Sequence, residues 1–238
     1  MINKSIMLEK MKKVRRMSML NFLMSSNPTP ALNQLDIKLT KYLNYENGFF
    51  IEAGANDGYT QSNTYYFETQ KHWKGVLIEA IPELANLCRV VRPSTPVYHC
   101  ALVADDYAQK TVTMKYGNLT SIVEGVYNDP EREKRAISKA LERGWIEKTY
   151  DIEVPARTLT SILDEITPAR IDLFSLDVEH YELSVLKGLD FTRYRPLYLL
   201  VETYWPDKIS ELLPPEYQQL EQMSPMDFLF GLRADAEK

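Results

Sequence analysis

The sequence predicts an α/β fold, a Rossmann-like and mainly parallel sheet with helices on both faces. Five short apolar runs are typical of strands buried on both faces, and they alternate with segments of helical character. The C-terminal region breaks this alternation and is expected to form an antiparallel hairpin, which brings the sheet to seven strands. At 238 residues the chain is long enough for one such domain with a full core.

The first half of the chain contains the first βαβ unit. Phe49, Phe50, Ile51 and Ala53 make the first apolar run, and residues 76–78 make the second. The helix between them is expected to be capped by Thr60 or Ser62. The elements that follow are a helix at 83–91 with Pro82 in its first turn, a third strand at 97–103, and an additional strand at 111–116 at the edge of the sheet or above it.

The second half continues the same pattern. A charged helix with Pro130 near its start is expected within residues 128–145 and should lie over the open end of the sheet. The remaining expected elements are an extended segment at 151–155, a helix from Thr158 to Ile166, a strand at 171–178, a helix at 182–189 closed by Gly188, a strand at 197–201, and hairpin strands at 217–222 and 228–232.

The first 30 residues differ from the rest in charge. Before Asn27 there are six basic residues and one acid, a balance of 6 − 1 = +5, so the remainder carries −5 − 5 = −10. We divide the chain into a basic amphipathic extension with a proline hinge (1–30) and a single domain (31–238) with a helical insertion at about 117–150. Membrane or partner contact through residues 1–24 is one interpretation, but a mobile extension or a helix laid against the domain is favoured.

Composition argues against several classes of protein. An acidic body repels nucleic acid. Cys88 and Cys100 offer neither a disulfide framework nor metal-ligand spacing, and they fit a reducing cytoplasm. The three histidines are scattered, which argues against a zinc site, and no apolar run approaches the length of a transmembrane helix.

The turn after the first strand indicates a ligand that contains adenosine. Gly54 and Gly58 bracket a turn in which the backbone must come close to a ligand. Glu79 ends the second strand, where an acid can accept two hydrogen bonds from a ribose diol. A tight turn with no ligand is the structural alternative.

The residues around this turn favour S-adenosylmethionine over NAD. A dinucleotide fingerprint needs a middle glycine, and this chain has Asn56 there. The carboxylates of Glu52 and Asp57 are poor neighbours for a pyrophosphate, but they suit a ligand with an ammonium and a sulfonium.

A second group of candidate residues follows the strand at 171–178. Asp177, Glu179 and His180 should reach the ligand edge within one turn, so a general base is expected among them. If the strand persists, both carboxylates face the same way and could bind a divalent metal, although no metal is favoured. The structural alternatives are an N-cap for Asp177, a first-turn acid for Glu179 and an incidental surface position for His180.

Three segments together resemble the FkbM-type methyltransferase family. They read FIEAGANDGYTQSNTYYFE at 50–68, WKGVLIEAIPE at 73–83, and RTLTSILDE with IDLFSLDVEHYELSVLKGLDF within 157–191; PLYLLVET at 196–203 extends the likeness. The resemblance implies the seven-stranded class I methyltransferase fold and methyl transfer from S-adenosylmethionine to a hydroxyl, commonly on a sugar or a secondary metabolite.

The resemblance also implies roles for individual residues. Glu52, Gly54, Asn56 and Gly58 would line the methionine end of the cofactor, with Ser62 and Asn63 reaching the same end, Glu79 on the ribose, Ala101 and Leu102 beside the adenine, and Asp177 beside the reacting centre. One position departs from the family, which usually has glycine where this chain has His180.

The competing interpretations are an NAD-linked oxidoreductase and a non-catalytic nucleotide-binding protein. Asn56 and the closing hairpin argue against the first, and the intact Glu79 and Asp177 argue against the second. Glu202, Tyr204 and Trp205 could shape a pocket for a small-molecule or carbohydrate acceptor, with core packing as the equal alternative for the two aromatic residues. The sequence assigns no oligomeric state.

Overall fold

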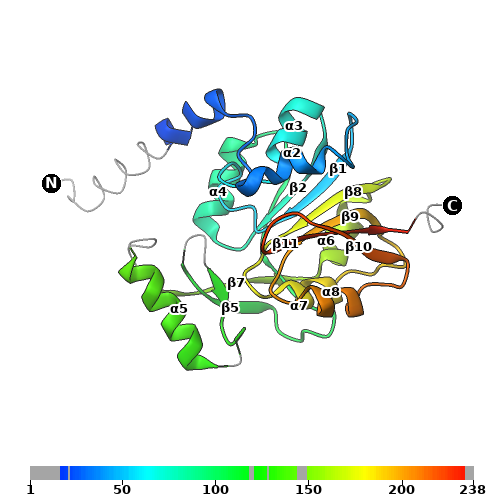
Figure 1. Ribbon diagram of the computed structural model, residues 1–238. Helices are drawn as coiled ribbons and strands as arrows, with labels where there is room; N and C mark the ends of the chain where they lie inside the picture. The colour runs from blue at the N-terminus through cyan, green and yellow to red at the C-terminus, as the bar shows by residue number, and fades with distance from the viewer. Residues whose placement is uncertain (1–16, 21, 118–120, 128, 144–148, 234–238) are drawn as a thin grey trace.

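The computed structural model describes residues 17–20, 22–117, 121–127, 129–143 and 149–233. These residues form an α/β fold on a seven-stranded, mainly parallel sheet (Figure 1). From one edge to the other its strands are β10 (Tyr217–Gln222), β11 (Asp227–Leu232), β9 (Pro196–Glu202), β8 (Ile171–Leu176), β1 (Phe49–Ala53), β2 (Lys74–Glu79) and β3 (Val97–His99). β9 to β3 are parallel neighbours, whereas β10 and β11 pair antiparallel at one edge. The predicted α/β class with a mainly parallel sheet is confirmed.

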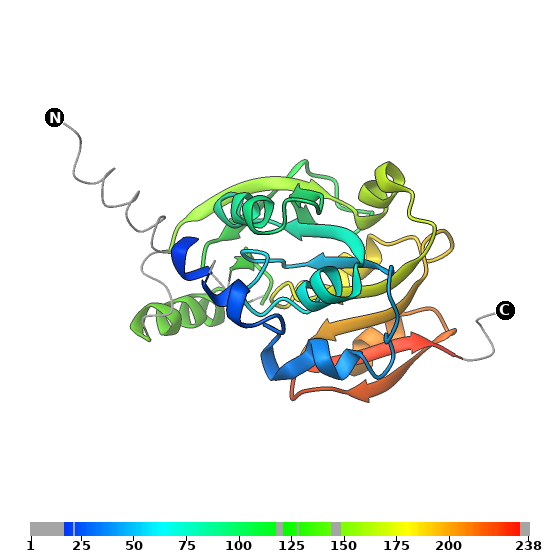
Figure 2. The same ribbon diagram turned by 90° about the horizontal axis from the view of Figure 1, so that it is seen from above.

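Helices cover both faces of this sheet. One face carries η1 (Leu32–Gln34), α2 (Leu35–Leu39), α3 (Tyr65–Lys71) and α4 (Pro82–Val91); the other carries α6 (Leu159–Ile166), α7 (Glu182–Lys187) and α8 (Pro206–Leu212). Figure 2 shows α2 beside the C-terminal hairpin, where Lys38 Nζ donates to the carbonyl of Met223 at 2.6 Å.

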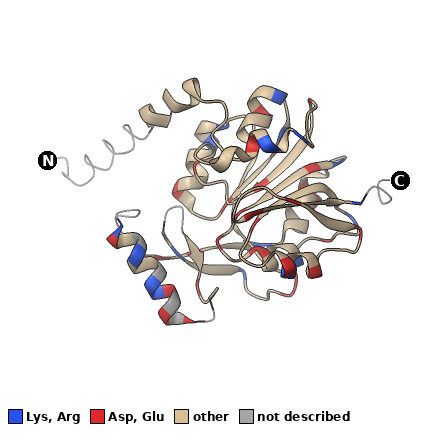
Figure 3. Cartoon of the chain, in the orientation of Figure 1, with Lys and Arg blue, Asp and Glu red and all other residues tan. Residues whose placement is uncertain are grey.

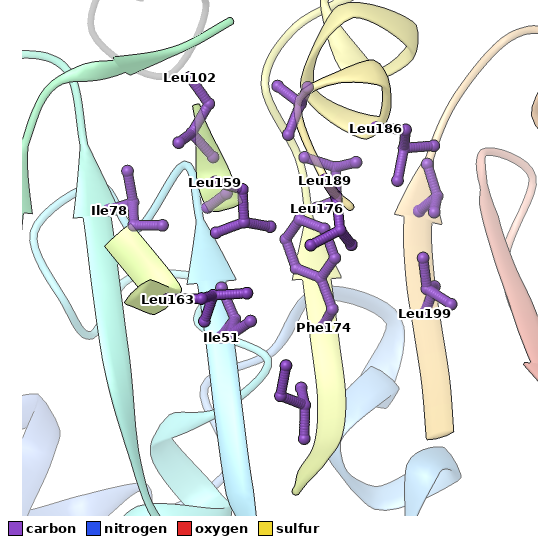
Figure 4. Close-up of a cluster of buried hydrophobic side chains, with 14 of the residues drawn as sticks. Ile51, Ile78, Leu102, Leu159, Leu163, Phe174, Leu176, Leu186, Leu189 and Leu199 are labelled. Carbon is purple, nitrogen blue, oxygen red and sulfur yellow. The ribbon is translucent and has the colours of Figure 1, made fainter. Parts of the chain in front are cut away.

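The pleat of the strands divides the core into two halves. Phe50, Leu77 and Leu173 point to the face of α2, α3 and α4. Ile51 and Phe174, one residue further along their strands, point to the face of α6 and α7 (Figure 4). Successive residues of a strand face opposite sides, so strands that are apolar throughout fill both halves at once.

Local chemistry fixes where the helices begin and end. Thr158 Oγ1 accepts from the amide of Ser161 at 3.1 Å, which confirms the predicted cap of α6. At α3, Ser62 Oγ accepts from the amide of Tyr65 at 3.0 Å, whereas Thr60 donates to Asp57 instead. Gly188 follows α7 with φ −89°, so it is not a left-handed terminator; a Cβ there would lie 2.0 Å from the carbonyl oxygen of Val103.

The strand predicted at 97–103 is wrong as a single element. β3 ends at His99, because its partner β2 ends opposite it at Glu79. After Cys100 the chain forms β4 (Ala101–Leu102), which pairs in parallel with β7 (Asp151–Arg157). A run of apolar residues does not reveal such a change of partner, because both halves of it are buried.

A second sheet of four strands, absent from the prediction, results from this change of partner. Its order is β4, β7, β5 (Thr111–Lys115) and β6 (Ile122–Val123). Helix α5 (Pro130–Glu142) packs on this small sheet, where Ile137 clusters with Ile122 and Glu133 accepts from the amide of Gly125 at 2.9 Å. Figure 3 shows basic and acidic residues along α5.

The described part of the N-terminal extension is helical and lies against the domain. Residues 17–20 and 22–26 are helical, and Leu20 is buried. Residues 1–16, with all six basic side chains of the extension, lie outside the described residues. No helix in the described ranges is both long enough and apolar enough to cross a bilayer.

Candidate active site

A pocket opens where β1, β2 and β8 reach their carboxyl ends. β1 has β2 on one side and β8 on the other, so the chain leaves β1 at a switch point of the sheet, the usual place for a ligand in such folds. The pocket encloses about 720 Å³, including the solvent at its mouth. Its lining includes Gly54, Asn56, Ile78, Glu79, Ile81, Leu84, Cys100, Ala101, Leu102, Met114, Ser121, Val123, Asp177, Glu179 and Tyr181.

The glycine turn after β1 is held between β2 and β8. The amide of Gly54 donates to the carbonyl of Ile78 at 3.0 Å. Gly54 has φ +83°, and a Cβ there would lie 1.7 Å from the carbonyl oxygen of Asp177. Only glycine allows this approach, so Gly54 brings the turn and the end of β8 into direct contact.

Glu79 lies at the end of β2 inside the pocket and organises this turn. Its two carboxylate oxygens accept from the amides of Asn56 and Ile81, both at 2.8 Å. Burial raises the pKa of Glu79 to about 7. The carboxylate has more lone pairs than its backbone contacts use, and the buried Oδ1 of Asn56 nearby has no hydrogen-bond partner. These acceptors fit the hydroxyl and ammonium donors of an adenosyl ligand.

Apolar residues from both sheets form the walls of the pocket. Ala101 and Leu102, predicted to flank an adenine, line it from β4. Met114 and Val123 line it from the small sheet and were not identified from the sequence. The alternation at 111–116 indicated a strand, but nothing in it showed that this strand would pack over the ligand edge.

Glu52 does not line the pocket, although the sequence placed it at the cofactor. It lies on the same face of β1 as Phe50, one residue out of phase with Ala53. Its carboxylate accepts from Ser62 Oγ at 2.9 Å and from the amide of Asn63 at 3.0 Å. The strand alternation therefore directs Glu52 behind the turn, where Ser62 and Asn63 join it in a hydrogen-bonded network.

Arg92 completes this buried network. Its side chain is 1 % exposed, and its Nη1 lies 3.0 Å from Glu52 Oε2. It also pairs with Glu68 of α3 and donates to Thr64 Oγ1 at 2.9 Å. One guanidinium thus joins the end of α4 to β1 and to the start of α3, and it fixes both ends of the turn. The sequence analysis did not identify Arg92, because an arginine at the end of a helix is usually solvated.

Asp57 and Gly58 shape the turn without lining the pocket. Asp57 Oδ1 accepts from the amides of Tyr59 and Thr60, at 3.1 and 2.8 Å. Gly58 has φ +84° and lies against α4, where its Cβ would meet the Cα of Cys88 at 3.2 Å. Both residues support the backbone that carries Gly54 and Asn56.

An acidic group lies opposite Glu79. Asp177 and Glu179 line the pocket, although β8 ends at Leu176 and no strand periodicity brings them together. Burial and the neighbouring carboxylates, Glu202 foremost, raise the pKa of Asp177 well above its ordinary value. Burial and Glu202 raise the pKa of Glu179 to about 8. The site therefore holds carboxyl groups that bind protons near neutral pH.

Glu182 supports the turn that carries these acids, and the sequence analysis missed it. It is 3 % exposed, and its Oε1 accepts from the amide of His180 at 2.9 Å. Burial raises its pKa to about 7. Its position in the first turn of a helix gave no sign of this contact.

His180 has a backbone that favours glycine and a side chain in an aromatic cluster. Its φ is +77°, following +51° at Glu179, so two residues in a row are left-handed. Its ring stacks on that of Tyr204, with the ring centroids 4.9 Å apart. The ring centroids of Trp205 and Tyr127 lie 5.8 Å and 4.9 Å from that of His180. His180 is not among the residues that line the pocket. Within the described ranges, no group of three or more His, Cys, Asp or Glu side chains could hold a metal ion.

Comparisons with known proteins give a match to one family. The model of the methyltransferase FkbM domain matches residues 52–228. Among curated proteins, none matches the chain.

Three solved structures are similar at low identity. Methyltransferase FkbM from Methylobacillus flagellatus KT is 14 % identical, with 92 % of this chain and 59 % of that chain covered and a TM-score of 0.46. A TehB-like SAM-dependent methyltransferase from Corynebacterium glutamicum is 8 % identical, with 97 % and 100 % covered and a TM-score of 0.44. TrmN from Thermus thermophilus is 9 % identical, with 84 % and 49 % covered and a TM-score of 0.45. This chain thus spans about half of the length of TrmN.

Replacing Arg92 by methionine should lower the free energy of unfolding by about 3–5 kcal/mol, because it leaves the buried carboxylate of Glu52 without its partner. Urea denaturation measures the change. Lys41→Met removes an exposed cation that pairs with Glu221 at 2.7 Å, and it should cost less than about 1 kcal/mol. Equal costs for the two variants would contradict a dominant role for the buried pair.

The melting temperature should fall as the pH rises from about 5.5 to about 8.5. The pKa values of Glu182 (about 7) and Glu179 (about 8) are raised above 4.5, so the folded protein binds more protons than the unfolded chain in this window. The stability these protons supply is lost as the pH passes the folded pKa values. Calorimetry at both pH values measures the effect.

Glu179→Gln should flatten this pH dependence. Glu165→Gln, at an exposed position where the hydrogen bond with Arg157 lowers the pKa, should leave it in place. The explanation fails if Glu179→Gln has the same pH dependence as the parent.

Proposed function

The chain belongs to the FkbM methyltransferase family, and we propose that it transfers the methyl group of S-adenosylmethionine to a hydroxyl oxygen of a sugar or a secondary metabolite. One observation carries this proposal: Glu79 and the turn from Gly54 to Asn56 share a pocket with Asp177 and Glu179. Groups suited to the cofactor and groups suited to an acceptor proton thus face the same space.

The chemistry of the lining supports the adenosyl cofactor. The free lone pairs of Glu79 suit a ribose diol, and the walls of Ile78, Ala101 and Leu102 suit the faces of a purine ring. The buried Oδ1 of Asn56, without a partner, suits a donor such as an ammonium group. Asn56 stands where a dinucleotide fingerprint has its middle glycine, which argues against NAD.

The reaction needs alignment and the removal of one proton. The bound cofactor supplies an electrophilic methyl group on a sulfonium. The acceptor oxygen would bond to this methyl group as the carbon–sulfur bond breaks, so that the sulfur leaves as a neutral thioether, and the hydroxyl proton would pass to a base. Orientation and the base each lower the barrier. Asp177 and Glu179 line the pocket and have raised pKa values, so their ionised forms are stronger bases than ordinary carboxylates.

We assign the base to this carboxylate pair rather than to His180. The imidazole of His180 lies in the aromatic cluster with Tyr204 and Trp205, outside the pocket lining. We propose that this cluster shapes the acceptor side of the site, because aromatic faces suit the apolar face of a sugar ring. The proposed reaction needs no metal.

The proposed function is tested by measuring binding and turnover in turn. Calorimetry should show binding of S-adenosylmethionine and S-adenosylhomocysteine, and none of NAD. Sugars and hydroxylated metabolites are then screened for methyl uptake from labelled cofactor. Binding of NAD with no heat from either adenosyl ligand would overturn the proposal.

Replacing Glu79 by alanine should weaken the cofactor by about 1.5–3 kcal/mol, the usual range for hydrogen bonds to a charged group. Glu79→Ala also leaves the amide of Asn56 without its acceptor. Glu79→Gln keeps one acceptor oxygen and should therefore reduce the affinity for the cofactor less than Glu79→Ala does. Calorimetry gives both affinities. Glu83→Ala on the exposed side of α4 is the control, and Glu79 is not the ribose ligand if Glu79→Ala binds as tightly as the parent.

The double variant Asp177→Asn/Glu179→Gln should lower kcat at least about a hundredfold, because it removes the base. In the parent, kcat should rise with pH through the pKa of the pair, near 8 for Glu179, since only the ionised form accepts a proton. The His180→Gly variant should show the same rise of kcat with pH, which is called here the rising limb of the pH profile. Full turnover by the double variant, or loss of the rising limb in His180→Gly, would move the base elsewhere.

A further inference from the structure

The helical residues 17–20 and 22–26, called here the N-terminal helical segment, lie outside the region matched by the family model, yet they contact the turn that forms the cofactor side of the pocket. Leu20 is 1 % exposed and belongs to a buried cluster with Tyr59, Tyr65 and Val91. Tyr59 directly follows Gly58, the last glycine of the turn, and Tyr65 begins α3. The helix therefore packs on both ends of the segment 59–65.

The same helix also reaches the wall of the pocket. Met17 packs against the Leu20 cluster and against a second cluster formed by Ile81, Leu84 and Leu87. Ile81 and Leu84 line the pocket. A single helix face thus contacts the turn on one side and the first residues of α4 on the other.

The chain that follows the helix is fixed to the turn by its backbone. Tyr59 donates its hydroxyl proton to the carbonyl of Asn27 at 3.0 Å. Ala31 then forms a parallel bridge with Gln61. The segment that the sequence predicts as a hinge, residues 27–30, is therefore tied to the turn at each end.

The turn needs such external contacts because of its backbone. Gly54, Asn56, Gly58 and Gln61 have φ values of +83°, +50°, +84° and +62°. A left-handed conformation costs free energy at Asn56 and Gln61, because their side chains disfavour it. Gly54 and Gly58 adopt it without this cost, but glycine has little backbone preference of its own. Such a segment holds one conformation only when its surroundings impose it.

We propose that the N-terminal helical segment, together with Asn27 after it, is a positioning element of the cofactor pocket, which holds the turn at 54–62 in its binding conformation through Leu20 and Asn27. This inference rests on the proposed function for the identity of the ligand. If the turn is ordered before the cofactor arrives, the cofactor does not have to order it, and the apparent affinity is higher.

The first test compares the inner and the outer side of the same helix. Leu20→Asp should weaken S-adenosylhomocysteine at least about tenfold in calorimetry and raise KM for the cofactor more than it lowers kcat, because the reacting groups stay in place. Phe22→Asp is the matched control, since Phe22 is 69 % exposed on this helix, and it should bind like the parent. Equal affinity for Leu20→Asp and Phe22→Asp would overturn the proposal.

Tyr59→Phe gives a milder test that keeps the helix packed. It removes only the hydrogen bond to Asn27 and should weaken the same ligand about two- to tenfold, the fold-change that one hydrogen bond supports. If Tyr59→Phe binds the ligand with the affinity of the parent, the hydrogen bond to Asn27 does not help to position the turn.

Hydrogen exchange distinguishes positioning from general destabilisation. In the ligand-free Leu20→Asp variant, the amides at 54–62 should exchange faster, whereas those of β9 and β11 should not change, and saturating ligand should restore protection. Faster exchange throughout the sheet would show that the helix stabilises the whole domain and does not specifically position the turn. If the parent protein binds neither adenosyl ligand, the proposed function fails. If the parent binds the ligand and Leu20→Asp binds it with the same affinity, only the positioning role is refuted.

Discussion

The close approach of Gly54 to Asp177 is the constraint on which the site depends. The amide of Asp177 donates to the carbonyl of Ala53 at 3.1 Å, and the space for a Cβ at Gly54 is taken by the carbonyl of Asp177. The turn after β1 and the turn after β8 are therefore one packed unit. Because Glu79 holds the first turn and Asp177 begins the second, the cofactor side and the acidic side of the pocket are placed relative to each other by backbone contact.

Buried charge is handled in two ways around this unit. Behind the turn, Arg92 pairs with Glu52 and Glu68, and hydroxyl groups and the amide of Asn63 supply further hydrogen bonds to Glu52. In front of it, no cation among the described residues forms an ion pair with Asp177, Glu179 or Glu182, and the pKa values of these three acids rise. A buried carboxylate is either paired or protonated, so the first group serves as structure, whereas the second can exchange protons near neutral pH.

Both of these turns contain non-glycine residues with left-handed backbone. Asn56 and Gln61 lie in the first, and Glu179 and His180 lie in the second, where the amide of His180 is held by Glu182. Such conformations persist only when their surroundings impose them. Arg92, Glu182 and the N-terminal helical segment supply contacts of that kind, and all three lie outside the pocket lining.

The α/β class, most strands of the main sheet, the turn from Gly54 to Gly58 and the acid at the end of β2 are predictable from the order of the amino acids, because apolar periodicity and glycine spacing are local signals. The other features depend on contacts between segments that are distant in the chain. The apolar run at 97–103 divides between two sheets because β2 offers no partner beyond Glu79. Glu52 faces Arg92 rather than the pocket, since a strand sends neighbouring residues to opposite sides and the sequence does not say which side holds the ligand. The contacts of Arg92, Glu182 and Leu20 join segments far apart in the chain or fix a strained turn, and no local pattern encodes such a partner.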